Sequence, residues 1–123
     1  MQRIMLKSKI HRAILTATEL DYIGSITVDA DLLEQADILA GEQVHVLNIN
    51  SGGRFITYAI AAEKSTGAVI LNGAAARLGQ VGDPVIILSY CNVGDRDGHR
   101  HKPRVVFVDQ RNRVREVRDA APE

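Results

Sequence analysis

The sequence has a single cysteine, Cys91, and therefore cannot form a disulfide within the chain. This excludes the small secreted domains that disulfides hold together and favours a reducing compartment, so we expect a cytoplasmic protein. No apolar run reaches the roughly 18 residues that a membrane helix needs, and no charged-then-apolar leader stands at the N-terminus. We therefore expect neither a membrane span nor an export signal. Cys91 follows the apolar run at residues 85–88, which predicts a buried structural thiol.

Tryptophan is absent and aromatic residues make up only 4% of the chain, although hydrophobic residues reach 46%. The core must therefore be built from aliphatic side chains. A chain of 123 residues is long enough for one hydrophobic core but not for two. We expect a single domain over residues 1–123.

Net charge is absent too, because 15 Lys and Arg residues balance 15 Asp and Glu residues. The basic residues are unevenly placed, since eight of them lie between Arg96 and Arg118 beside only three acids. The simplest interpretation is a polar, partly flexible C-terminal segment at about residues 92–123. The alternative is a non-catalytic β-barrel module that binds nucleic acid through this basic segment.

Several common site patterns are missing. His99 and His101, taken with Cys91, offer at most three metal ligands in a polar segment without paired thiols, so we expect no metal site. The sequence also lacks a Walker loop and a dinucleotide fingerprint, and the residues around Ser25 do not match the G-x-S-x-G pattern of serine hydrolases.

The sequence is rich in short β-type runs separated by Gly, Asn and Asp, at the spacing of a small barrel or sandwich. We expect strands at residues 3–10, 13–18, 25–28, 44–49, 55–61, 68–71, 85–90 and 105–108. The segment D-A-D-L-L-E-Q-A-D-I-L-A-G-E (29–42) differs. Asp31 and Glu34 resemble a capping box there and Gly41 can end the turn, which predicts one short helix.

Four segments carry residues suited to chemistry: K-S-K-I-H-R (7–12), Y-I-G-S (22–25), G-R-F-I-T-Y-A (53–59) and N-G-A-A-A (72–76). Each alone has an ordinary explanation as a turn or an exposed strand face. Together and in this order they resemble the pyruvoyl-dependent aspartate 1-decarboxylase family. The resemblance covers roughly the first 90 residues, includes T-Y-A-I-A-A-E (57–63) and V-G-D-x-V-I-I (81–87), and fades beyond Cys91.

The resemblance implies a proenzyme that cuts itself between Gly24 and Ser25, giving chains 1–24 and 25–123. The Ser25 hydroxyl would attack the Gly24 carbonyl and turn an amide into an ester; β-elimination and hydrolysis would then leave a pyruvoyl group. Glycine at position 24 suits this reaction, because it adopts strained backbone angles and has no side chain to block attack. Thr57 would donate a hydrogen bond to the Gly24 carbonyl oxygen.

The implied reaction is the decarboxylation of L-aspartate to β-alanine and carbon dioxide, which supplies pantothenate and coenzyme A. The pyruvoyl ketone would form a Schiff base with the substrate amine and act as the electron sink. The substrate carboxylates need cationic partners, for which we expect Arg54, Lys9 and His11. Tyr58 would return a proton to the α-carbon. The other expected binding residues are Tyr22, Thr57, Asn72 and the backbone amides of Gly73, Ala74 and Ala75.

The family fold is a double-psi β-barrel, so the resemblance implies a mainly β protein with one or two short helices. It also implies a homotetramer with sites between neighbouring subunits, and neither metal, nucleic acid nor membrane as a partner. Thr57 and Tyr58 are adjacent and would point to opposite faces of a regular strand. Thr57 would then face the Gly24–Ser25 bond of its own chain. Tyr58 would reach a site completed by the neighbouring subunit, or sit where the strand bends.

Overall fold

A single mixed sheet of nine strands dominates the computed structural model, which describes residues 1–119. Its strand order is β2-β6-β3-β5-β4-β7-β1-β8-β9. The strands are β1 (Gln2–Ile14), β2 (Ala17–Glu19), β3 (Ser25–Asp29), β4 (Gln43–Asn48), β5 (Arg54–Ala62), β6 (Val69–Asn72), β7 (Pro84–Gly94), β8 (Arg104–Val108) and β9 (Val114–Asp119). Three short helices join them: α1 (Ala30–Ala36), the 3-10 helix η1 (Gly73–Leu78) and α2 (Asp95–Gly98). This confirms the prediction of a small, mainly β, barrel-like fold.

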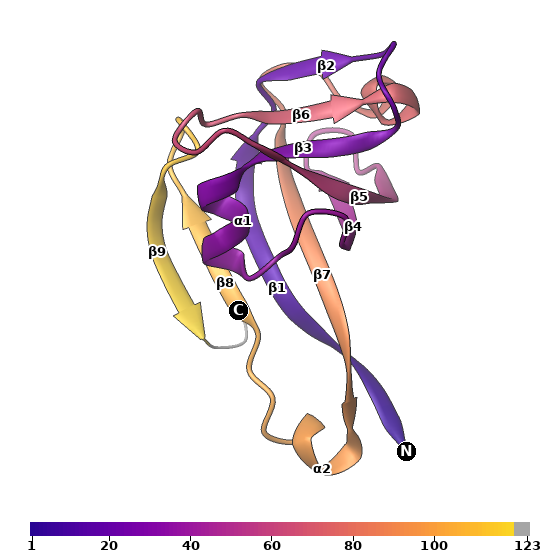
Figure 1. Ribbon diagram of the computed structural model, residues 1–123, viewed down its shortest axis with the longest axis vertical. Helices are drawn as coiled ribbons and strands as arrows, with labels where there is room; N and C mark the ends of the chain where they lie inside the picture. Colours follow the sequence, from indigo (N-terminus) through magenta and orange to yellow (C-terminus); the bar gives the residue numbers. More distant parts are fainter. Residues whose placement is uncertain (120–123) are drawn as a thin grey trace.

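Strand β1 connects the two ends of the molecule. It pairs antiparallel with β7 and parallel with β8, and Figure 1 shows β1 and β7 running side by side down to α2 and the N-terminus. We expected a break between strands at residues 3–10 and 13–18, and this prediction is wrong. The chain continues as one strand because a register shift between Ile10 and Ala13 accommodates the extra residues, with Arg12 at a φ of 66°.

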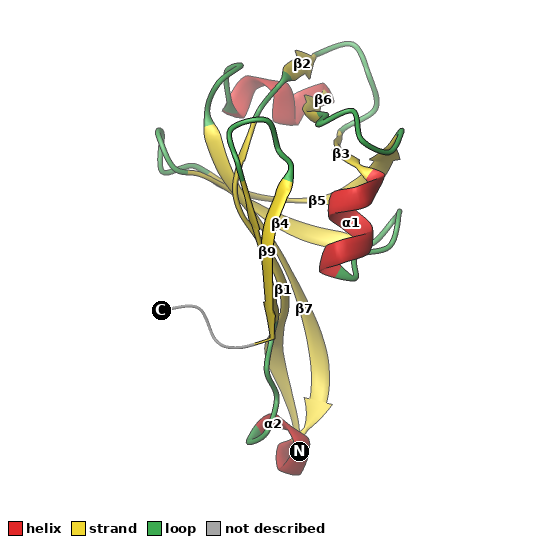
Figure 2. Ribbon diagram, turned by 90° about the vertical axis from the view of Figure 1, so that its left-hand side faces the viewer, coloured by secondary structure: helices red, strands yellow, loops and turns green. Residues whose placement is uncertain are grey.

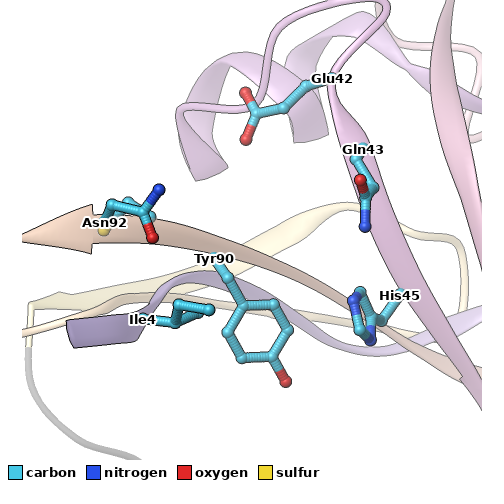
Figure 3. A pocket seen from close by; sticks show the side chains of 7 residues that line it. Ile4, Glu42, Gln43, His45, Tyr90 and Asn92 are labelled. Atoms are coloured by element: carbon cyan, nitrogen blue, oxygen red, sulfur yellow. The ribbon is translucent and has the colours of Figure 1, made fainter. Parts of the chain in front are cut away.

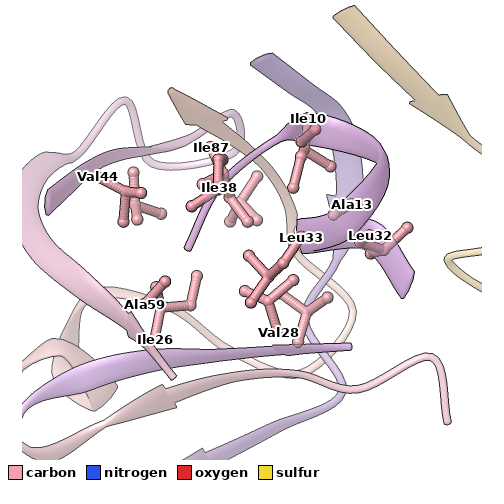
Figure 4. Close-up of a cluster of buried hydrophobic side chains, with 14 of the residues drawn as sticks. Ile10, Ala13, Ile26, Val28, Leu32, Leu33, Ile38, Val44, Ala59 and Ile87 are labelled. Carbon is pink, nitrogen blue, oxygen red and sulfur yellow. The ribbon is translucent and has the colours of Figure 1, made fainter. Parts of the chain in front are cut away.

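The core lies on the inner face of the curved sheet, where α1 covers one end (Figure 2). Every second residue of β3 points into it, as Ile26 and Val28 do, which is the alternation expected of a half-buried strand. Leu32 and Leu33 of α1 close the cluster (Figure 4). The buried hydrophobic residues of the described chain are all Ile, Leu, Val or Ala, which confirms the prediction of an aliphatic core.

Helix α1 begins earlier than predicted. Its N-cap is Asp29, whose carboxylate accepts hydrogen bonds from the backbone amides of Asp31, Ser65 and Gly67 at 2.8, 3.1 and 2.8 Å. The helix ends at Asp37, which has a left-handed φ of 57°. The capping box at Asp31 and the stop at Gly41 are therefore wrong. Asp29 is preferred because its side chain also satisfies amides of the β5–β6 turn, a contact that local sequence does not reveal.

The C-terminal segment contains α2 and the paired strands β8 and β9, up to Asp119. Strand β9 pairs with β8, and the turn between them is held by Asn112, which is only 2% exposed. The Asn112 side-chain amide donates to the carbonyl oxygens of Ile14 and Gly67 at 2.9 and 2.8 Å, and its oxygen accepts from the Ile14 amide at 2.7 Å. The expectation of a partly flexible arm is therefore wrong for residues 92–119. Residues 120–123 of the expected arm lie outside the described residues.

Candidate active site

Ser25 is the first residue of β3 and lies opposite Asn72 of β6. Both side chains are buried, Ser25 completely. The Asn72 side-chain nitrogen donates to Ser25 Oγ at 3.0 Å and to Thr27 Oγ1 at 2.8 Å, which uses both of its hydrogens. Ser25 Oγ donates in turn to the Ile23 carbonyl oxygen at 3.1 Å. The Ser25 oxygen is therefore held over the stretch of backbone that contains the Gly24 peptide.

Gly73, at the start of η1, packs directly on this backbone. A Cβ atom at Gly73 would lie 2.7 Å from both the nitrogen and the Cα of Gly24, and 2.8 Å from the Tyr22 carbonyl oxygen. The φ of Gly73 is also left-handed, at 62°. Both features require glycine. The contact places the start of η1 beside Gly24, and the first amides of this helix, those of Gly73, Ala74 and Ala75, have no acceptor within the helix itself.

Gly24 is under no such constraint. It is not among the residues with positive φ, and a Cβ atom there would meet nothing within 4 Å. Our expectation that Gly24 is needed for strained backbone angles is therefore wrong for this conformation. The steric demand for glycine lies across the contact, at Gly73.

Thr57 and Tyr58 come from β5, which runs parallel to β3. The register pairs Ile26 with Ala59, and its continuation places Ser25 beside Tyr58 and Gly24 beside Thr57. Tyr58 is 37% exposed, whereas Thr57 is half-buried and pairs with the core residue Val44. The two side chains therefore point to opposite faces, as the alternation predicts. Asn72 donates to Ser25 Oγ, whereas the expected hydrogen bond from Thr57 to the Gly24 carbonyl oxygen is not formed within residues 1–119 of this structure.

The three expected cationic residues lie away from Ser25 of the same chain. Arg54 precedes Tyr58 by four residues on β5, roughly 13 Å along the strand, and its guanidinium donates to Tyr90 Oη at 3.4 Å. Lys9 and His11 lie on β1, four strand positions from β3 in the sheet order, which is roughly 19 Å measured along the curved sheet. The chain thus brings Tyr22, Gly24, Asn72 and Gly73 together around Ser25, but not Lys9, His11 or Arg54.

His11 has an unusual setting. Its Nδ1 atom is buried and has no hydrogen-bond partner in residues 1–119. Burial lowers the pKa of His11 below its ordinary value, and the positive charges of Lys9 and Arg12 lower it further. The imidazole is therefore biased toward its neutral form.

A groove of about 410 Å³ opens on the outer face of β1, β4 and β7 (Figure 3). The Tyr90 ring packs edge-on against His45, with 4.9 Å between centroids, and it is the same Tyr90 that accepts from Arg54. The groove also exposes part of Cys91, which is only half-buried, so the prediction of a buried thiol is wrong. The groove is lined by Ile4, Glu42, Gln43, His45, Tyr90, Cys91 and Asn92.

Residues 1–119 contain neither a candidate metal centre nor a helix suited to crossing a membrane. In residues 1–119, no three His, Cys, Asp or Glu side chains gather in a way that could hold a metal ion. His101, one of the sequence candidates, instead places Nε2 at 2.7 Å from the Leu6 carbonyl oxygen. None of the helices in this part of the chain combines the length and apolar character that crossing a bilayer requires.

The basic C-terminal segment is partly neutralised by ion pairs. Its arginines at 100, 104 and 118 pair with acids at 97, 119 and 116, at 3.2, 3.2 and 2.6 Å. The acid at position 119 lies just outside the basic run counted from the sequence. Folding therefore leaves the segment with less uncompensated positive charge than the sequence suggests, which weakens the case for a nucleic-acid surface.

Sequence reasoning missed three polar neighbours of the candidate residues. The Asn72 side-chain nitrogen donates to Thr27 as well as to Ser25. Thr27 could have been predicted from the sequence, because it lies two residues after Ser25 and therefore on the same face of the strand. Ile23 contributes only its backbone carbonyl, which no pattern of side chains marks. Tyr90 of β7 accepts a hydrogen bond from Arg54 of β5, and β4 lies between these two strands. Only the strand order of the sheet brings the two residues together.

Comparison with known proteins gives one consistent result. The family profile described as aspartate decarboxylase matches residues 1–115. Curated proteins named aspartate 1-decarboxylase align with almost the whole chain. The protein from Thermoanaerobacter pseudethanolicus is 58% identical over 92% of this chain and 97% of its own. The protein from Syntrophomonas wolfei is 53% identical over 95% of this chain and 99% of its own. The protein from Caldicellulosiruptor bescii is 52% identical over 94% of this chain and 90% of its own.

The family match extends further than the motifs suggested. Motif reasoning ended near Cys91, yet the profile runs to Arg115 and so includes β8 and the start of β9. In the structure this additional matched segment contains β8, which pairs with β1 beside Lys9 and His11. With an ordered set of motifs, a full-length profile match and relatives more than half identical, the chain belongs to the aspartate decarboxylase family.

Proposed function

We propose that this protein is a proenzyme that cleaves itself at Gly24–Ser25 and then decarboxylates L-aspartate to β-alanine and carbon dioxide. The observation that carries the proposal is the buried Ser25 hydroxyl, fixed by Asn72 against the backbone of the matched Gly-Ser motif. The single cysteine is compatible with a reducing, cytoplasmic location.

Self-cleavage requires only Ser25, its preceding peptide and water. Ser25 Oγ attacks the Gly24 carbonyl carbon, the C–N bond breaks, and the nitrogen of residue 25 becomes a free amine while an ester forms. Elimination then breaks the ester, releases the Gly24 carboxylate and leaves a dehydroalanine; water replaces its nitrogen, which departs as ammonia. The hydrogen bonds of Ser25 Oγ to Asn72 and Ile23 hold the nucleophile next to the bond it attacks.

The residues around Ser25 fit a pyruvoyl group at this position. Once formed, such a group supplies a ketone that accepts the substrate amine and the electrons released with carbon dioxide. Asn72 directs one side-chain N–H at residue 25 and the other at Thr27. The amides at the start of η1 lie beside the same atoms, because Gly73 permits the close approach. The position of Tyr58, in the row next to Ser25 and open to solvent, supports its proposed role as the acid that returns a proton to the α-carbon.

A second subunit supplies the cationic side chains of Arg54 and Lys9, together with the His11 imidazole, which its lowered pKa biases toward the neutral form. Arg54, Lys9 and His11 alternate with the inward-facing Phe55 and Ile10 and so lie on the outer face of β5 and β1, and within the described residues none of them is hydrogen-bonded to Ser25 of its own chain. This face also exposes large apolar side chains, with Ile4 75% and Ile56 60% exposed. Exposed apolar side chains on one face are typical of an interface. A homotetramer that packs this face near a neighbour's Ser25 completes each site from two chains.

The first experiment is intact mass spectrometry of the purified protein. We expect fragments 1–24 and 25–123, with the longer one blocked at its start, and formation of β-alanine from aspartate. Ser25→Ala should remain one inactive chain. Ser89→Ala is the matched control, because Ser89 is equally buried and its hydroxyl has no partner in the described residues. An uncut wild-type chain that binds DNA or RNA in a salt-dependent way would instead support the nucleic-acid alternative.

Sites shared between chains can be tested by coexpressing two inactive variants. Lys9→Ala removes a substrate-binding side chain that one chain supplies to the proposed site. Tyr58→Phe removes the proton donor that the other chain supplies. In randomly mixed tetramers up to about one quarter of the sites combine an intact Lys9 with an intact Tyr58 from different chains, and activity should recover in that proportion. If both residues act within one chain, no mixed site is complete and activity stays at the level of the separate variants.

A further inference from the structure

His11 lies directly beside the C-terminal hairpin. Strand β8 runs parallel to β1, and the register pairs His11 with Phe107. The two rings meet edge-on, with 5.6 Å between their centroids and an angle of 70° between their planes. This separation and angle are typical of a favourable aromatic pair. In Figure 1, β8 lies beside β1, the strand that carries His11, and β9 lies on the far side of β8.

The Phe107 ring is itself held by the last strand. The Arg118 guanidinium lies over it, 4.9 Å from the ring centroid, in a cation–π contact. Arg118 Nε pairs with Glu116 Oε2 at 2.6 Å, and Glu116 is the register partner of Phe107 on β9. A chain of contacts thus runs from Glu116 through Arg118 and Phe107 to His11.

Only one nitrogen of the His11 imidazole is accessible for binding a ligand. Nδ1 is enclosed and has no partner in residues 1–119, so Nε2 is the atom left for a ligand. A ring with one usable nitrogen binds well only if its orientation is fixed, because rotation about χ2 would turn Nε2 away. No hydrogen bond in the described chain fixes His11, which leaves the edge-on contact with Phe107 as the orienting interaction.

We propose that Phe107, held in place by Arg118, is a positioning residue that orients Nε2 of His11 toward the bound aspartate. The inference rests on the proposed function, in which His11 contributes to the substrate site. It assigns a role in the site to the C-terminal hairpin, the segment expected from sequence to be a polar arm. The charged groups around His11 are Lys9 and Arg12 on its own strand and, beyond Phe107, the ion pair of Arg118 with Glu116.

The experiment compares Phe107→Leu with Phe107→Tyr, which keeps the aromatic ring. For Phe107→Leu we expect a roughly three- to tenfold rise in KM for aspartate with a smaller change in kcat, the range that loss of one aromatic pair predicts. Phe107→Tyr should restore KM to near the wild-type value. Arg118→Gln, which leaves Phe107 in place, should raise KM by a smaller factor. Arg104→Gln is the matched control, since it breaks an exposed ion pair of the same hairpin that does not touch Phe107.

A second readout does not depend on activity. The carbon-bound ring protons of His11 give NMR signals whose positions depend on the neighbouring aromatic ring. They should move in Phe107→Leu and in Arg118→Gln, and stay in place in Arg104→Gln. Unchanged His11 signals together with an unchanged KM in Phe107→Leu would overturn the inference. If the wild-type protein is uncut and inactive, the proposed function fails, and the NMR signals alone decide whether Phe107 positions the ring.

Discussion

Gly73→Ala should block maturation although residue 73 takes no part in the bond changes. The new methyl group would lie 2.7 Å from the nitrogen and Cα of Gly24, closer than a side-chain carbon can approach backbone. Alanine at a left-handed φ of 62° costs roughly 1–2 kcal/mol relative to glycine. Displacing the Gly24 backbone adds about 1–3 kcal/mol, by analogy with overpacked cores.

The total of about 2–5 kcal/mol is smaller than the roughly 6–18 kcal/mol stability expected for a domain of this length, so the variant should fold. Its melting temperature should fall by roughly 8–19 °C. Because the overpacked atoms belong to the scissile segment, Gly24 moves away from Ser25 Oγ. A shift on the order of 1 Å slows a reaction of this kind by about 10²-fold.

The matched control is Gly24→Ala, in which the same methyl group is added across the contact but meets nothing within 4 Å. Cleavage of the precursor over time is quantified by intact mass, and unfolding is followed by circular dichroism at one protein concentration. We expect Gly73→Ala to remain largely uncut while Gly24→Ala matures at close to the wild-type rate. Equal cleavage in both variants, or a block in Gly24→Ala alone, would refute the steric reasoning.

Four further predictions concern individual side chains. Thr57→Val keeps the shape and removes the hydroxyl, and it should slow cleavage by about 2–4 kcal/mol in the barrier, measured by mass over time; a wild-type rate would exclude Thr57 as an oxyanion donor. Tyr58→Phe should mature normally but produce β-alanine about 10²- to 10⁴-fold more slowly, and full activity would mean that another group supplies the proton. Arg54→Lys should self-cleave yet lose aspartate turnover, because a point charge does not replace the planar fork; unchanged kcat/KM would remove Arg54 from the site. His11→Gln should make the free energy of unfolding less dependent on pH. Because the pKa of His11 is lowered in the folded protein, the unfolded chain binds a proton first, and the wild-type protein loses stability as pH falls below about 6.5 toward that lowered value. Urea titrations that show the same loss of stability in both proteins would contradict this.

Local sequence was sufficient for much of the sheet. The strands β3, β4, β5, β6 and β8 lie within one or two residues of their predicted positions, because alternating apolar residues and turn residues specify each strand independently of its partners. The ordered motifs likewise identified the family, since Gly24, Ser25, Asn72 and Gly73 stand in short segments whose spacing is visible in the chain. The adjacent positions of Thr57 and Tyr58 already implied opposite faces.

Tertiary structure decided how these segments meet. Gly73 must be glycine because it rests on Gly24, 49 positions earlier, and no local pattern encodes that contact. β8 pairs with β1 across almost the entire chain, which turns a run of basic residues into the strands beside His11. The sheet order also separates Lys9 from Ser25 by four strand positions, although both belong to the matched motifs. Short-range preferences set the angles of each segment, but register and strand order depend on which surfaces can be buried together, and this is a property of the whole fold.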